Sequence, residues 1–210
     1  MGESCLSLLS FPLEIRFLIY DYLCGTEPEC FRMDMYPVSS IAFGPPPRSL
    51  LLSCRQIHTE VQHHYYSIAT LRLTSLGFVQ PRTAISSRAL FMIRQARRVE
   101  LVLQWNVFFP RGTVGPAHEI STRNRRWLQD QVALIVDEGQ NIKTILVSLR
   151  DPSPWGDWAS KKPVLEPLEL LRGRAYFARG EVIASARAEK EITVRLTQYL
   201  HDLNRSLVSS

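Results

Sequence analysis

Three histidines close together in the sequence are the first residues to consider for chemistry, because clustered histidines can bind zinc. His58, His63 and His64 follow Cys54 in a segment whose apolar residues keep helical spacing. A zinc site on one helix needs two histidines at positions i and i+4 with a glutamate between them, and no pair here has that pattern. Cys54 and His58 supply only half of such a site. We therefore predict solvated or core histidines, with no metal and no cofactor.

Other reactive side chains also lack a catalytic pattern. The sequence has no Gly-x-Ser-x-Gly, Walker or dinucleotide-binding motif, and the segment RGTVGP is too short and has a proline where a phosphate-binding helix would begin. The carboxylate pairs Asp137/Glu138 and Glu166/Glu169 lie at expected helix ends, where acidic residues are common. We therefore predict that the chain is not an enzyme and has no catalytic residues.

The positive charge of the chain is spread along its length. The sequence has 210 residues, a net charge of +5 and a pI of about 9.2. Its densest basic clusters, RQARR and RNRR, have no repeating aromatic residues beside them and fit solvated helix faces or ends. We predict no specific nucleic-acid binding. Any non-specific binding to DNA or RNA is expected to be weak and sensitive to salt.

The sequence also lacks the features of membrane and secreted proteins. No apolar run approaches the ~20 residues that cross a bilayer, and no basic segment leads into an apolar one at the N-terminus. The cysteines are few and unevenly spaced, as expected of reduced thiols rather than of a disulfide framework. We predict an intracellular protein, cytoplasmic or nuclear, with no membrane partner.

Alternating strands and helices follow an N-terminal helical region. Strands are expected near Arg72, Leu101, Leu146 and Val182, with helices between them, at intervals of ~30 to 45 residues. This rhythm predicts parallel strands joined by helical crossovers. Residues 26–47, rich in proline, are expected to form a long irregular loop between two N-terminal helices.

These elements predict an α+β fold with two parts. Residues 1–68 are expected to form a helical module that packs on a small α/β layer of residues 69–210. The layer resembles a degenerate leucine-rich repeat in its rhythm. Because no leucine-rich consensus is present, an ordinary open α/β sheet is the alternative.

The first helix, in LLSFPLEIRFLIYDYLCG, has apolar side chains on two opposite faces. Pro12 suits its first turn and Gly25 its end. At about 100° per residue, one face is expected to pack on the core: Phe11, Ile15, Leu18, Ile19, Tyr22 and Leu23. The opposite face collects Leu13, Phe17, Tyr20 and Cys24. This second face is either buried within the same domain or available to a partner protein.

Two blocks of the N-terminal third carry a family resemblance. LLSFPLEIRFLIYDYL and LLLSCRQIHTEVQHHYY resemble the F-box-like module at the N-terminus of a large set of filamentous-fungal proteins. The matching positions are Phe11, Pro12, Glu14, Ile15, Arg16, Ile19 and Tyr20, then Leu51, Leu52, Cys54, Arg55, Ile57 and Glu60. F-box proteins use this module to hold the Skp adaptor of cullin-based ubiquitin ligases, and a second domain to hold a client protein.

The resemblance implies a non-enzymatic adaptor that bridges a cullin-type ubiquitin ligase to a client protein of unknown identity. The second face of the first helix then supplies the partner-binding residues Leu13, Phe17 and Tyr20. Trp155 and Trp158 lie in a proline-containing loop and either contact the client or fold back as a lid on the sheet edge. The alternative function is a structural or regulatory interaction module of the same fold with no ubiquitin-ligase role.

Overall fold

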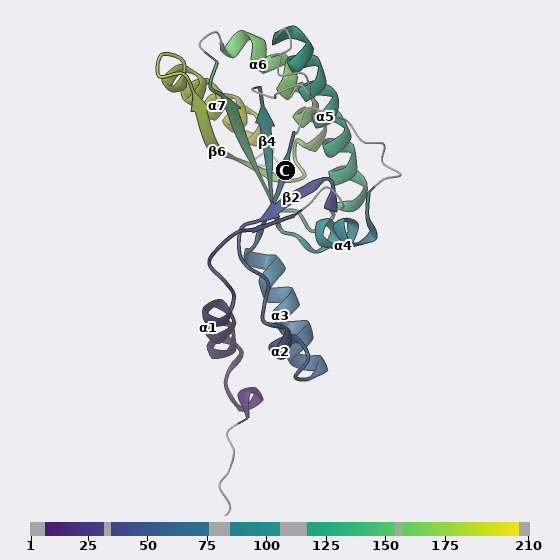
Figure 1. Ribbon diagram of the computed structural model, residues 1–210. Coiled ribbons are helices and arrows are strands. Elements are labelled where there is room, and N and C mark those ends of the chain that lie inside the picture. Colours follow the sequence, from purple (N-terminus) through teal and green to yellow (C-terminus); the bar gives the residue numbers. More distant parts are fainter. Residues whose placement is uncertain (1–6, 32–34, 76–84, 106–116, 154–156, 206–210) are drawn as a thin grey trace, which may run out of the picture.

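A computed structural model describes residues 7–31, 35–75, 85–105, 117–153 and 157–205 of the chain (Figure 1). Two regions are visible. The helical module consists of η1 (Leu8–Ser10), α1 (Leu13–Leu23), α2 (Arg48–Leu51) and α3 (Arg55–Ile68). It extends from one end of the α/β body, which contains the strands and the remaining helices.

The α/β body is built on a mixed sheet that has six strands within the described residues. The strands are β1 (Glu29–Cys30), β2 (Val38–Ile41), β3 (Thr70–Thr74), β4 (Arg98–Gln104), β5 (Thr144–Asp151) and β6 (Tyr176–Ala184). They lie in sequence order across the sheet. The first two pairings are antiparallel, and β3 to β6 are parallel. The predicted α+β class and the parallel strands with helical crossovers are confirmed.

Helices cover one face of the sheet, and all but the last of them connect two parallel strands. They are α4 (Ser87–Gln95), α5 (Ala117–Glu138), α6 (Trp158–Leu165), η4 (Glu166–Leu171) and α7 (Glu189–Asn204). Alternate residues of β4 and β5 point to these helices and are fully buried with them in one apolar cluster, with Leu101 and Val147 near its centre. The opposite face carries polar side chains such as Arg72, Glu100 and Ser148.

Local sequence explains several boundaries of these helices. The Ser86 hydroxyl accepts a hydrogen bond from the Ala89 backbone N–H and caps α4, and Asp157 caps α6 through the Ser160 N–H. The expected helix stop at Gly139 is confirmed, because α5 ends at Glu138. At the C-terminus, the Asn204 amide exchanges two hydrogen bonds of 2.8 Å with the backbone N–H and C=O of Phe177 on β6.

The prediction that residues 26–47 form an irregular loop is wrong. This segment contains β1 and β2, and β2 pairs with β3. Residues 1–68, predicted as a helical module, therefore also contain two strands of the sheet. Strand β2 has the sequence VSSI, which is too short and too polar to show an alternating pattern. Its strand conformation depends on pairing with a segment about thirty residues away, which local patterns do not reveal.

Candidate functional site

Helix α1 packs on α3 around a small apolar cluster of its own. Tyr20, Ile57 and Val61 are buried in this cluster, and Leu8, Phe17, Leu50 and Leu51 surround it. It is separate from the large cluster of the α/β body. The C-terminal part of α3 belongs to the body, because Tyr65 is buried in the large cluster and donates a 2.8 Å hydrogen bond to the Phe43 carbonyl.

A charged network joins the two helices beside this cluster. The Arg16 guanidinium donates to both carboxylate oxygens of Glu60, at 2.9 and 2.8 Å, and to the carbonyl of Phe11 at 2.6 Å. The Tyr20 hydroxyl also donates to Glu60, at 3.1 Å. Arg16 is buried, and such bidentate charged pairs are stronger than neutral hydrogen bonds. The network therefore fixes the position of α1 on α3.

The electrostatics of Glu60 follow from these contacts. Burial alone would raise the pKa of its carboxyl group, but hydrogen bonds from Arg16, Gln56 and Tyr20 lower that pKa below the ordinary value. Burial, followed by the hydrogen bond to Glu60, raises the pKa of Tyr20. The hydrogen bond to Glu60 also raises the pKa of Arg16, so the ion pair remains charged near neutral pH.

A second contact between α1 and α3 involves one of the clustered histidines. His64 Nε2 lies 2.6 Å from Asp21 Oδ1, and the His64 ring stacks on Phe17 with centroids 4.4 Å apart. The other two histidines point elsewhere: His58 Nδ1 contacts the Leu51 carbonyl, and His63 Nε2 contacts Arg97. The described residues include no group of three or more His, Cys, Asp or Glu side chains that could hold a metal.

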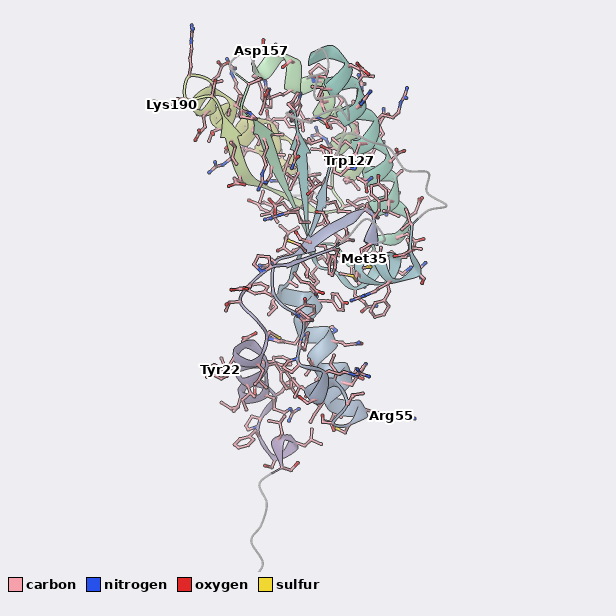
Figure 2. The ribbon with its side chains drawn as sticks, viewed as in Figure 1. Tyr22, Met35, Arg55, Trp127, Asp157 and Lys190 are labelled. Carbon is pink, nitrogen blue, oxygen red and sulfur yellow. The ribbon has the colours of Figure 1, made fainter. Side chains whose placement is uncertain are left out.

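The structure reverses the expected assignment of the two faces of α1. Tyr20 and Cys24, from the face predicted for a partner, are 0% and 6% exposed, and Phe17 packs on α3. From the face predicted for the core, Leu18 is 64% and Tyr22 is 89% exposed. Figure 2 shows Tyr22 pointing away from α3. Leu13 is exposed, but Phe17 and Tyr20 are not surface candidates for a partner.

The spacing of apolar residues does not show which face of α1 is buried, for a physical reason. Both faces of α1 are apolar, so hydropathy alone cannot select between them. The buried face contains Arg16, whose charge is tolerated there only because Glu60 neutralises it. Sequence reasoning passed over this pair, although Arg16 and Glu60 stand in the two blocks of the family resemblance. The two blocks contact each other, and their charged positions hold the module together.

The exposed apolar face of α1 is the candidate interaction surface. We call it the α1 surface and define it by Ile15, Leu18, Tyr22 and Leu23 of α1 together with Phe11, which precedes the helix; all five are exposed. Large apolar side chains gathered on one exposed face commonly mark sites of protein association. Because α1 is fixed by the Arg16 and Glu60 network, this surface is preformed.

The prediction that Trp158 lies in a loop is wrong, because this residue begins a helix of the α/β body. Trp158 is the first residue of α6, is half-buried and packs edge-on against Tyr199 with ring centroids 6.2 Å apart. Burial raises the pKa of the Tyr199 hydroxyl to about 12, and this hydroxyl donates to the Leu165 carbonyl. Trp158 thus lies against the edge of the body core, as the lid interpretation expects. Trp155 lies outside the described residues.

A polar row crosses the second face of the sheet. Arg72 Nε donates to Glu100 at 2.8 Å, the Ser148 hydroxyl donates to the other Glu100 oxygen, and the Glu181 N–H donates to Ser148. Gly180 is required beside this row, because a Cβ atom at that position would overlap the Ser148 hydroxyl. The hydroxyl of Ser148 is fully buried and is both donor and acceptor, so its hydrogen bonds are satisfied within the sheet.

A buried ion pair lies at the carboxyl end of β5. Lys161 Nζ on α6 donates to Asp151 and lies 4.8 Å from the centre of the Trp105 ring. Lys161 and Asp151 are 0% and 3% exposed at their side chains. The other Asp151 oxygen accepts hydrogen bonds from Ser153. The pair ties α6 to the sheet, and no pattern in the sequence indicated it.

Comparisons with known proteins give no match: no protein-family model, no curated protein and no solved structure is significantly similar to this chain. The F-box-like resemblance therefore depends on the two sequence blocks alone. Among the helices in the described ranges, none is both long and apolar enough to cross a membrane.

Proposed function

We propose that this protein is a non-enzymatic, F-box-like adaptor that bridges a cullin-type ubiquitin ligase to a client protein. The α1 surface is the binding site for a Skp-type adaptor in this proposal. One observation carries it: Leu18 and Tyr22 leave most of their area in solvent on a helix whose inner face packs on α3. Burying such anchors against a partner supplies several kcal/mol of binding energy in typical interfaces.

The architecture of the module supports this proposal. The Arg16 and Glu60 pair and the His64 and Asp21 contact hold α1 from its inner side, so its outer side is presented without rearrangement. Preorganised surfaces bind more tightly because less conformational entropy is lost on association. The client-binding part of the proposal concerns residues 69–210 and is supported by the resemblance alone. A cytoplasmic or nuclear location is part of the same proposal.

The test is a charge placed in the centre of the α1 surface. We expect Leu18→Glu to abolish co-purification of the Skp adaptor and cullin with the full chain, while thermal unfolding stays close to wild type. Val194→Glu is the matched control, because Val194 is an equally exposed apolar residue on α7, far from α1 in the sequence. The control is expected to retain the adaptor.

Two results of this co-purification test would contradict the proposal. If the folded wild-type chain captures no Skp adaptor, the ubiquitin-ligase role is wrong. The alternative function, an interaction module of the same fold without a ligase component, would then replace it. Equal adaptor capture by wild type and Leu18→Glu would show that the adaptor binds elsewhere on the chain.

A further inference from the structure

The exposed apolar residues of the α1 surface have the spacing of a coiled-coil seam. Ile15, Leu18 and Tyr22 lie on α1 and are separated by steps of three and four residues. This is the a/d spacing that packs one helix against another, with Ile15 and Tyr22 at a and Leu18 at d. All of these residues are exposed. The occupant that matches this seam is a helix.

Acidic residues lie at both g positions of the same register. Glu14 precedes Ile15 and Asp21 precedes Tyr22, so the two carboxylates lie along one flank of the seam, one heptad apart. Glu14 is exposed and forms no ion pair with another described residue. Asp21 contacts His64 but its side chain is still 47% exposed. In coiled coils, residues at e and g select the partner by charge.

No cation of α1 balances this acidic flank. Arg16 is the one basic residue of α1, and it is buried on the inner face, where its Nε and one terminal nitrogen donate to Glu60 and its other terminal nitrogen donates to the Phe11 carbonyl. The seam is therefore bordered by negative charge, although the whole chain has a net charge of +5. A partner that binds this flank needs positive charge.

We infer that the α1 surface binds an amphipathic helix that has an apolar a/d seam and lysine or arginine at the flanking positions that meet Glu14 and Asp21. The inference uses the same surface as the proposed function and rests on it for the claim that the surface binds a partner. It adds the secondary structure and the charge of the segment that is bound.

A second copy of α1 fits this surface less well. In an antiparallel pair the g positions of the two helices meet, which would bring Glu14 and Asp21 of one copy against the same acids of the other. In a parallel pair Glu14 would meet Ile19 and Asp21 would meet Thr26, which lies beyond the end of α1, and neither of these partners carries a charge. An anionic lipid surface also fits poorly, because interfacial helices bear lysine and arginine beside their apolar face. A basic helix satisfies both the seam and its flank.

Two designed helical peptides provide the direct test. Both have leucine at a and d, and they differ only in carrying lysine or glutamate at e and g. Binding to the full chain is measured by fluorescence anisotropy in low-salt and high-salt buffer. We expect the lysine peptide to bind about tenfold more tightly than the glutamate peptide at low salt, with the difference shrinking as salt screens the charges.

Charge-swap variants identify the flank that is responsible. Glu14→Lys is expected to narrow or reverse the preference between the two peptides, whereas Glu191→Lys, an exposed acid on α7, is expected to leave it unchanged. The inference is wrong if wild type binds neither peptide, binds both equally or prefers the glutamate peptide. It is also wrong if Glu14→Lys leaves the preference for the lysine peptide unaltered.

The outcomes of this test are separate from those of the proposed function. If the lysine peptide binds with the expected preference but no Skp adaptor is captured, the ligase role is wrong and the basic-helix inference stands. If Leu18→Glu loses the adaptor while the two peptides bind wild type equally, the adaptor role stands and the charge inference is wrong. Sedimentation of the chain alone is expected to show a monomer, and a dimer lost in Leu18→Glu would favour the second copy instead.

Discussion

The α/β body and the helical module differ in the contacts that stabilise them. The body has a continuous apolar cluster that includes strands from β2 to β6 and helices from α4 to α7. Among the described residues, the buried members of the module's cluster are Tyr20, Ile57 and Val61, and the module also depends on the Arg16 and Glu60 ion pair and on the contact of His64 with Asp21. Apolar burial is insensitive to pH, whereas ion pairs are not. The body also contains the buried pair of Lys161 and Asp151, but beside a far larger apolar cluster. We therefore expect mutation and acid to change the stability of the two regions differently.

The largest effect is expected for the buried ion pair of the body. Lys161→Met leaves the Asp151 carboxylate buried without its cation, which should lower the free energy of unfolding by about 3 to 5 kcal/mol. Urea unfolding followed by tryptophan fluorescence measures the change. Lys162→Met is the matched control, because Lys162 is exposed on the same helix and should change stability by less than about 0.5 kcal/mol. Similar losses in both variants would contradict the role of the pair.

Truncation of buried side chains tests whether the module and the body unfold independently. Leu101→Ala in β4 and Ile57→Ala in α3 each remove a buried aliphatic side chain, at a cost of about 2 to 5 kcal/mol for such sites. Native-state hydrogen exchange should locate the loss. We expect Ile57→Ala to expose the amides of α1 and the first half of α3 while β4 and β5 stay protected, and Leu101→Ala to weaken the body throughout. Loss of protection in β4 and β5 after Ile57→Ala would show that the chain unfolds as one unit.

Acid is expected to loosen the module before the body. The pKa of Glu60 is lowered in the folded chain from its ordinary value of 4.5, so its stabilising contribution is complete above that value and is lost as the pH falls through the folded pKa. Hydrogen exchange of α1, corrected for the intrinsic effect of pH, should therefore rise on acidification. Glu60→Gln keeps the shape of the side chain but should flatten this dependence. An unchanged dependence in Glu60→Gln would assign the acid response to other groups.

The smallest effects separate the two faces of α1. Leu18→Ala should change the free energy of unfolding by less than about 0.5 kcal/mol, because Leu18 is mostly exposed. Phe17→Ala should cost more, since Phe17 stacks on His64 and such aromatic contacts contribute about 0.5 to 1.5 kcal/mol beyond area burial. Protection of the α1 amides in hydrogen exchange gives the comparison. A larger loss in Leu18→Ala than in Phe17→Ala would contradict the arrangement of α1 on α3.

The body was largely predictable from its sequence because its elements carry local signals. The alternation in RVELVLQW and the apolar run in IKTILVSLR predict β4 and β5, and Gly139 predicts the end of α5. The same local signals are missing where the prediction failed. Strand β2 is defined by its pairing with β3 and not by its residues.

The candidate site was harder to predict than the fold. The helical wheel of α1 contains two apolar faces, and the choice between them depends on Glu60, which lies forty-four residues from Arg16 in the sequence. The buried pair of Lys161 and Asp151 was equally hard to predict, because a lysine is ordinarily a surface residue and its sequence gives no sign of burial. The fold determines which distant charged residues come into contact. The periodicity within one helix or strand therefore cannot predict these contacts.

The order of strands across the sheet bears on how the chain folds during synthesis. Each strand pairs with the strand that precedes it along the chain, so a growing sheet never waits for a later strand to fill a gap. Contacts between near neighbours in sequence favour fast folding, and N-terminal parts of a nascent chain fold first. The body can therefore grow one strand and one helix at a time as the ribosome releases them. Helix α7 docks on β6 after that strand has paired, where Asn204 bonds to the backbone of Phe177.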